Sequence, residues 1–247
     1  MKVAVLTDVH ANLPALEAVR RDFANKEIQS IWNLGDAIGY GAEPFACLQL
    51  LADLDSLFIT GNHEQAACDL AEANNFNSAA AHSIRWTRDK LAPDTRQDLF
   101  ELPVNASPHP GGFLFHGLPG NTTGYLRTVE TAQMVFNHLA DRDSRIRVAF
   151  FGHTHLPMIF THLTGRPVHI LEPEEELILA PGRQYLINPG SVGQPRNGDP
   201  NAQYLIFDIE KDHISFRKVP YDISTAQERI LQAGLSPSLA ARLTQGI

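Results

Sequence analysis

Short apolar runs alternate with helical patterns of apolar residues through the first half of the chain. The apolar runs occupy residues 3–6, 28–34 and 57–59, and residues 14–23 and 44–54 show helical spacing between them. Strands that alternate with helices are typical of a parallel sheet whose helices cross over its faces. Ligands of such sheets bind beyond the carboxyl ends of the strands, so the residues after each run are candidates for a site.

The pattern continues through the middle of the chain and then changes. Helices are predicted over residues 77–91 and 128–139, and strands over 113–115 and 147–151. Six strand-like runs follow with turn residues between them, at 158–163, 168–171, 177–179, 185–187, 204–209 and 213–219. Since no helical pattern separates these six runs, we expect them to form an antiparallel second sheet.

Two short helices are predicted near the end of the chain. Ser224 and Gln227 have the spacing of a capping box, which predicts that a helix begins at Ser224, and residues 236–243 form another. Together the elements predict an α/β fold with a single domain over residues 1–247. We expect a two-sheet β-sandwich, with mixed parallel and antiparallel strands, flanked by helices.

Composition narrows the class of protein. Hydrophobic residues make up 43% and charged residues 19% of the 247 residues, which excludes a disordered chain. The net charge of −8 disfavours polymeric nucleic acid as a partner, because few cations are present to neutralise phosphates. No apolar window reaches the ~18 residues of a membrane span, and no signal-peptide pattern opens the chain, so we expect no membrane partner and a cytoplasmic location. Two cysteines, Cys47 and Cys68, provide no disulfide framework.

Metal-capable side chains follow five of the predicted strands. The chain has eleven histidines, and histidine is the commonest metal ligand in proteins. The five segments are Asp8-Val9-His10, Gly35-Asp36, Gly61-Asn62-His63-Glu64, Phe115-His116-Gly117 and Gly152-His153-Thr154-His155. On an extended backbone, both ends of a D-x-H or H-x-H sequence face the same side. A single buried histidine is usually an ordinary core residue, but five such segments together predict a metal site.

The five motifs, in this order, resemble those of the calcineurin-like metallophosphoesterase superfamily: D-x-H, G-D, G-N-H-[DE], H and G-H-x-H. Residues 39–41, 188–196 and 219–222 further resemble the small prokaryotic phosphodiesterase group of that superfamily. The resemblance covers nearly the whole chain and implies a metallophosphoesterase-like fold. It also implies a phosphodiesterase that acts on a small phosphodiester or a nucleotide.

The resemblance implies a binuclear metal centre. One divalent ion would be held by Asp8, His10, Asp36 and His155, and the other by Asp36, Asn62, His116 and His153, so that Asp36 bridges the two. Imidazole and carboxylate ligands without thiolates suit Mn²⁺, Fe or Zn²⁺ better than Ca²⁺. Two divalent ions exceed two carboxylates and one hydroxide by a single positive charge, which matches a phosphodiester monoanion.

By the same resemblance, a hydroxide that bridges the metals attacks phosphorus in line. We expect His63, one residue beyond Asn62, to point away from the metals toward the substrate. There it would stabilise the transition state or protonate the leaving group. The alternative for His63 is a purely structural role.

Other residues are weaker candidates, each with two interpretations. Arg196 either binds a substrate phosphate, or is a surface arginine or one that pairs with Asp199. Tyr40 and Tyr125 either flank a base or an aryl group of the substrate or are packing residues. Glu64 is expected to support His63 or a metal ligand. Ser191 lacks the G-x-S-x-G surroundings of a nucleophile and is interpreted as part of a turn.

Several alternatives stay open at this point. The same motifs occur in hydrolases of dinucleoside polyphosphates and in phosphomonoesterases, phosphoprotein phosphatases included. A metal-dependent binding module without turnover is the non-enzymatic alternative. The helical segment 74–102 either forms a partial lid or completes the outer helical layer. The helix with Leu235, Leu239 and Leu243 packs on its own sheet or on a second subunit, so a homodimer is also open.

Overall fold

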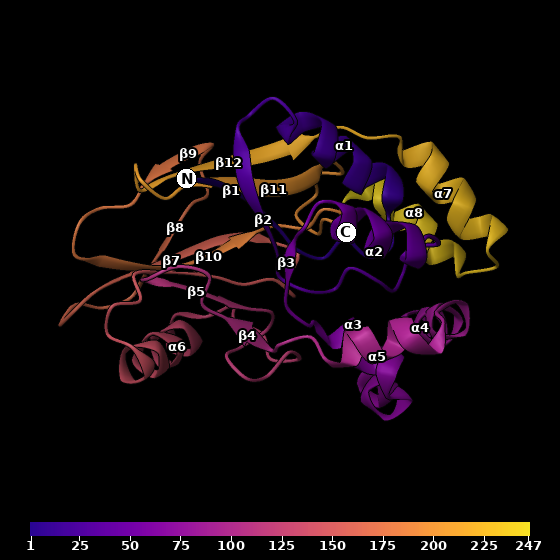
Figure 1. Ribbon diagram of the computed structural model, residues 1–247, viewed down its shortest axis with the longest axis horizontal. Helices are drawn as coiled ribbons and strands as arrows, with labels where there is room; N and C mark the ends of the chain where they lie inside the picture. The colour runs from indigo at the N-terminus through magenta and orange to yellow at the C-terminus, as the bar shows by residue number, and fades with distance from the viewer.

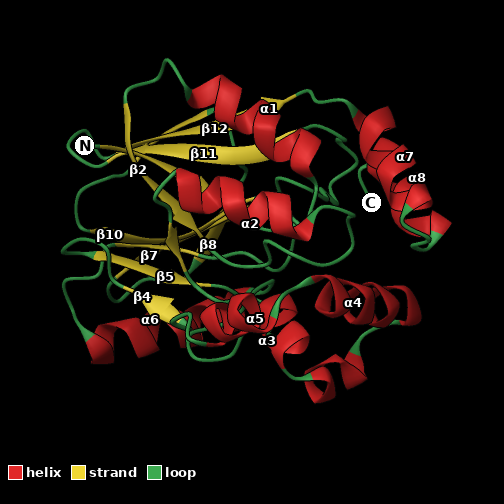
Figure 2. Ribbon diagram, turned by 45° about the vertical axis from the view of Figure 1, so that its right-hand side comes forward, coloured by secondary structure: helices red, strands yellow, loops and turns green.

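Two six-stranded sheets face each other, and helices cover their outer surfaces (Figure 1, Figure 2). This computed structural model describes residues 1–247. The chain therefore forms the two-sheet sandwich expected from its sequence, with parallel and antiparallel strands in both sheets. None of the helices combines the length and the apolar character needed to cross a bilayer.

The first sheet is built around the N-terminal strand. Its order is β3-β2-β1-β11-β12-β9, with β1 Lys2–Leu6, β2 Ile28–Asn33, β3 Leu57–Phe58, β9 Glu176–Ile178, β11 Ala202–Asp208 and β12 His213–Val219. β1, β2 and β3 are parallel, with Ala4 opposite Ile31. β11, β12 and β9 extend the sheet as antiparallel neighbours.

The second sheet has the same mixed character. Its order is β4-β5-β6-β10-β7-β8, with β4 Asn105–Ala106, β5 Gly112–Phe115, β6 Val148–Phe150, β7 Pro157–Leu163, β8 His169–Leu171 and β10 Arg183–Pro189. β5, β6 and β10 are parallel, whereas β7 is antiparallel to both β10 and β8.

The late strands do not form a sheet of their own, so that expectation is wrong. β7, β8 and β10 join the second sheet, and β9, β11 and β12 join the first. The reason is burial: every residue of β11 and most of β10 are buried. A strand covered on both faces is stable only inside a sheet, and the strands of the first half supply the neighbours.

Nine helical segments surround the sheets: α1 Leu13–Phe23, α2 Pro44–Asp53, α3 Asn62–Cys68, the 3₁₀ helix η1 Leu70–Asn75, α4 Ser78–Lys90, α5 Pro93–Phe100, α6 Val129–Arg142, α7 Ile223–Gln232 and α8 Pro237–Gln245. One apolar core lies between the first sheet and the helices α1 and α2, a second between the two sheets, and a third beneath α6. The leucines of the α8 region pack on α7, Tyr40 and Ala80 of the same chain rather than on a sheet.

The start of α7 differs from the sequence expectation. Asp222, not Ser224, caps the helix, and its carboxylate accepts the Thr225 N–H at 3.0 Å. Ser224 lies inside the first turn, and its hydroxyl donates to the same carboxylate at 2.6 Å. The pattern thus predicted the helix but placed its N-cap two residues late, because a capping aspartate satisfies the same helix donors.

We predict that Asp222→Ala lowers the free energy of unfolding by about 1 kcal/mol, because the Thr225 N–H loses its acceptor. Ser224→Ala is the matched control and should change stability by less than about 0.5 kcal/mol. Urea titration followed by circular dichroism measures both. Equal losses for the two variants would contradict the assignment of the cap.

Candidate metal centre

The candidate residues gather at one edge of the sandwich. Asp8, Asp36 and Asn62 follow the strands β1, β2 and β3 of the first sheet, while His116 and His153 follow β5 and β6 of the second. Their side chains are all buried. Because both sheets end their parallel strands at this edge, residues far apart in sequence meet in one small volume.

The motif residues do not lie on extended backbone, as the alternation argument assumed. Asp8, His10, Asp36, His153 and His155 have φ angles between 49° and 65°, in the left-handed region. Side chains rarely adopt this region, and such strain clusters at functional sites. Backbone hydrogen bonds hold these turns, among them His10 N–H to the Asp36 carbonyl at 2.9 Å.

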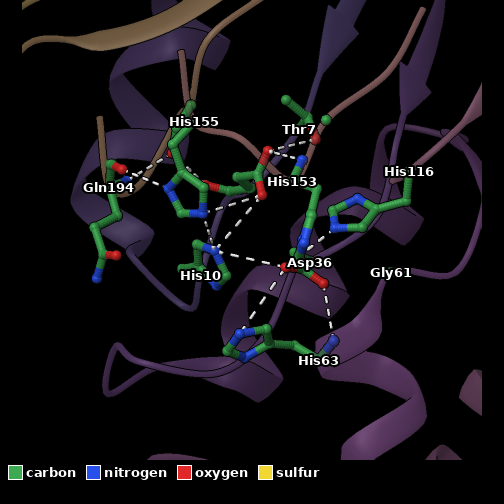
Figure 3. A network of polar contacts seen from close by, with 12 residues as sticks. Thr7, His10, Asp36, Gly61, His63, His116, His153, His155 and Gln194 are labelled. Carbon is green, nitrogen blue, oxygen red and sulfur yellow. Dashed lines mark hydrogen bonds and ion pairs between the residues drawn. The ribbon is translucent and has the colours of Figure 1, made fainter. Parts of the chain in front are cut away.

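Asp8, His10 and His155 form the first group of candidate ligands. His10 Nδ1 lies 3.1 Å from the Ile38 carbonyl, and His155 Nδ1 lies 2.6 Å from the Gln194 carbonyl (Figure 3). A carbonyl only accepts, so each Nδ1 carries the proton and each Nε2 presents a lone pair. The two Nε2 atoms face each other at 3.1 Å, and Asp8 Oδ1 lies 3.3 Å from the Nε2 atom of His155. Three acceptors this close repel one another unless a cation lies among them.

Asp36, His116 and His153 form the second group. His116 Nδ1 donates to the Leu34 carbonyl at 2.7 Å, which turns its Nε2 toward Asp36 Oδ2 at 3.2 Å. His153 Nε2 and Asn62 Oδ1 are buried without any hydrogen-bond partner. Buried polar atoms are nearly always satisfied, so atoms left without a partner here fit the ligand shell of a metal.

Each aspartate has one oxygen fixed by the protein and one left free. Asp8 Oδ2 accepts from the Thr7 hydroxyl at 2.8 Å and from the His153 N–H at 3.1 Å. Asp36 Oδ1 accepts the His63 N–H at 2.9 Å, and its Oδ2 lies 3.8 Å from His10 Nε2. Figure 3 shows Asp36 between the histidines of the two groups. The free oxygen of Asp36 can therefore serve both groups.

Comparison with known proteins agrees with this arrangement. A family model described as the calcineurin-like phosphoesterase superfamily domain matches residues 1–212. The chain belongs to this superfamily. The metallophosphoesterase fold expected from the motifs is thereby confirmed.

The chain is also similar to individual proteins over its full length. It is 34% identical to the uncharacterised protein MJ0912 of Methanocaldococcus jannaschii, over 99% of this chain and 98% of that protein. The crystal structure of a metallophosphoesterase from Sphaerobacter thermophilus has 34% identity, a TM-score of 0.86, and coverage of 100% and 99% of the two chains. The hypothetical protein PH1004 from Pyrococcus horikoshii OT3 shares the fold, with 19% identity, a TM-score of 0.80, and coverage of 100% and 98%.

The electrostatics of this superfamily member favour bound cations. Burial lowers the pKa of His10 and His155 well below the usual value and that of His153 to about 3, so these imidazoles are neutral, as ligands must be. Burial raises the pKa of Asp8 to about 7. Burial alone would lower the pKa of His116, but the nearby carboxylate of Asp36 outweighs it and raises this pKa to about 9. The position therefore attracts positive charge. The imidazole and carboxylate donors fit two divalent ions.

The Glu64 carboxylate supports the centre by accepting backbone N–H groups rather than by contacting the side chain of His63 or of a ligand. Its Oε2 accepts the N–H groups of Gly61 at 2.8 Å and Asp36 at 2.7 Å, and its Oε1 accepts those of Ala37 and Ile38 at 2.8 and 3.3 Å. The carboxylate is fully buried, and burial raises its pKa to about 7. Glu64 thus fastens the turn that carries Asp36 to the first turn of α3.

A cavity of about 300 Å³ opens beside the centre. Eight residues that the sequence suggested line this cavity: Asp36, Tyr40, Asn62, His63, Tyr125, His153, His155 and Arg196. Glu72 and Thr123 were missed from the sequence, and Asn75, Phe76, Asn77 and Ala80, which complete the lining, were covered only as part of the segment 74–102. Part of the predicted segment 74–102 therefore borders the cavity, while its remaining helices pack on α3. No local pattern distinguishes these lining residues from ordinary loop residues.

His63 does not point away from the candidate ligands. Its Nε2 lies 4.0 Å from Asp36 Oδ2, and its ring packs on His10 and Tyr40 with centroid distances of 4.7 and 4.6 Å. Asn62 and His63 begin the helix α3, where consecutive side chains are only about 100° apart instead of opposite. His63 borders both the centre and the cavity.

Hydrogen bonds bear on the interpretations of Arg196 and Ser191. Arg196 donates to Gln194 Oε1 at 2.9 Å, whereas Asp199 pairs with Lys218 at 3.0 Å, so the Arg196–Asp199 pair does not form. Ser191 donates its hydroxyl to the Asp8 carbonyl at 2.8 Å, which agrees with its interpretation as a turn residue.

We predict that Glu64→Gln lowers the free energy of unfolding by more than about 2 kcal/mol. Each Glu64 oxygen accepts two N–H groups, so either orientation of the amide places an NH₂ against two donors. The exposed Glu72→Gln on η1 is the control and should change stability by less than about 0.5 kcal/mol. Urea titration measures both, and a loss below 1 kcal/mol for Glu64→Gln would refute the bracing role.

Proposed function

We propose that this chain is a metal-dependent phosphodiesterase that cleaves small phosphodiesters or nucleotides. The observation that carries the proposal is the pair of facing lone pairs on His10 and His155 beside the shared carboxylate of Asp36. The facing lone pairs favour one cation, and the unpartnered Nε2 atoms of His116 and His153 favour a second, next to a cavity of small-molecule size. Membership of the calcineurin-like superfamily supports a metal-dependent phosphoesterase in the broader sense.

The residues proposed to hold the ions are those that the resemblance implies, and the two groups support most of them. Asp8, His10, Asp36 and His155 would hold one divalent ion, and Asp36, Asn62, His116 and His153 the other. Mn²⁺, Fe or Zn²⁺ suits these ligands. Bound there, the ions would neutralise charge on the phosphate and lower the pKa of water to supply the nucleophile. Because Asn62 is neutral, the centre carries one negative charge fewer than it would with an aspartate there. This favours a monoanionic diester.

His63 is proposed to stabilise the transition state. Burial lowers its pKa to about 4, so the imidazole is neutral and donates one N–H. Its ring borders the cavity beside Asp36 and is held between Tyr40 and Phe76. A hydrogen bond from this N–H to an oxygen of the phosphate would strengthen as negative charge develops there.

Arg196 and Tyr40 are proposed to bind and orient the substrate. Gln194 holds one nitrogen of the Arg196 guanidinium, while Arg196 Nε is buried without a partner. The guanidinium borders the cavity and would bind a phosphate oxygen that the metals leave free. Tyr40 also lines the cavity, where it would contact the substrate, and it packs against His10 and His63 and would keep both rings in place. The cytoplasmic location and the homodimer stay predictions.

We predict that chelator-stripped protein does not hydrolyse bis(p-nitrophenyl) phosphate and that Mn²⁺ restores turnover. The centre binds cations, and its acceptors alone provide no nucleophile. Release of p-nitrophenol is measured with and without metal, and bound metal is counted by elemental analysis. Turnover without metal would overturn the proposal. Cleavage of p-nitrophenyl phosphate or of a dinucleoside polyphosphate alone would indicate the monoesterase or the polyphosphate hydrolase, and two bound ions without any turnover would indicate a binding module.

We predict that His63→Ala lowers kcat on the same diester by about 100-fold while both metal ions stay bound. The exposed His169→Ala on β8 serves as the control and should leave kcat unchanged. A loss below tenfold with full metal content would assign His63 a purely structural role. Loss of metal together with kcat would instead make it a ligand.

A further inference from the structure

The cavity wall that lies opposite the metal centre comes mostly from one short stretch of the chain. Glu72 and Asn75 belong to η1, Phe76 and Asn77 follow it, and Ala80 lies in the first turn of α4. The turn after β5 adds Thr123 and Tyr125. None of these residues belongs to the ligand groups, so this wall contacts the part of the substrate that the metals do not bind.

We propose that this wall binds a nucleoside, with the base stacked on Phe76. The inference rests on the proposed phosphodiesterase function and names the group that its substrate carries. The phosphate would lie at the metal centre and the nucleoside between Phe76 and Tyr125.

Two aromatic rings, those of Phe76 and Tyr125, line the cavity. The half-buried ring of Phe76 packs on His63 with a centroid distance of 4.9 Å. The ring of Tyr125 is 49% exposed, lies 4.2 Å from that of His153, and has the Arg127 guanidinium 4.5 Å from its centre. Flat apolar surfaces of this kind hold a base by stacking, whichever base it is. A simple alkyl group offers no flat face to either ring.

The polar groups of the wall suit a neutral heterocycle. No hydrogen bond fixes the side chains of Glu72 or Asn75, and Asn77 uses its Oδ1 to cap α4 at 3.0 Å and keeps its NH₂ free. Amides present donors and acceptors that match the edge of a base. The carboxylate of Glu72 repels a second phosphate in this part of the cavity.

The size of the cavity limits how much substrate enters. About 300 Å³ is the lower end of small-molecule sites, which suits one nucleoside and not both halves of a dinucleotide. A second esterified group would extend into solvent past the mouth.

The test compares two esters with the same leaving group and charge, thymidine 5′-(p-nitrophenyl phosphate) and methyl p-nitrophenyl phosphate, on the Mn²⁺-loaded protein. The ratio of their kcat/KM values isolates the contribution of the nucleoside. We expect a ratio above about ten for the natural chain, from stacking of one base. Phe76→Leu should lower the ratio by about tenfold, Phe76→Tyr should keep it, and Phe100→Leu, with its 71% exposed ring outside the cavity, should leave it unchanged.

The outcomes separate this inference from the proposed function. Hydrolysis of neither ester would refute the phosphodiesterase. Hydrolysis of both with a ratio near one, or an equal ratio in Phe76→Leu and the natural chain, would refute the nucleoside subsite alone. Competition by free adenosine but not by ribose supports recognition of the base, and competition by ribose alone would overturn it.

Discussion

The structure depends on a set of buried acceptor atoms that face one another. His10 and His155 direct lone pairs at each other across 3.1 Å, with a free carboxylate oxygen of Asp8 beside them. In each of these side chains the protein fixes one polar atom and leaves the other free. Such a cluster is costly without positive charge, since buried charges and lone pairs lose their hydration. The fold holds it in place, and cations would stabilise it.

Holding the cluster requires a backbone that cannot relax. Several of the ligand-bearing residues lie at positive φ, which side chains avoid unless the surroundings impose it. The surroundings here are hydrogen bonds from distant segments. Glu64 fastens the turn of Asp36, and the loop around Ser191 and Gly193 fastens the carbonyl of Asp8. A Cβ on Gly193 would lie 1.8 Å from the Val9 carbonyl oxygen, so only glycine allows this approach.

The sequence predicted the elements that depend on local pattern. The apolar runs and the polar residues after them located β1, β2 and β6 and the candidate residues Asp8, Asp36 and His153. It did not predict features that depend on distant contacts. The central places of β10 and β11, the turns that replace extended backbone, and the orientation of His63 are set by contacts between different elements. These contacts span 27 residues for His63 and Asp36 and 145 residues for His10 and His155. Phe76 carried no signal, because only the tertiary fold turns it toward the centre.

The centre and the cavity wall are therefore built in different ways. Strand ends from both sheets carry the candidate ligands, so a change in one of them disturbs several long-range contacts. The wall comes from η1 and the start of α4, which are tied to the centre at several places besides the packing of Phe76 on His63. One is the hydrogen bond from the Tyr40 N–H to the Ser83 hydroxyl, and another is the apolar cluster that includes Ala80 and Tyr40. Because residues in contact are coupled energetically, a change at Phe76 also affects His63, whereas an exposed wall residue such as Asn75 can change with less effect on the candidate ligands. The same strand framework can thus serve many phosphoesters, with specificity set by a short helical segment.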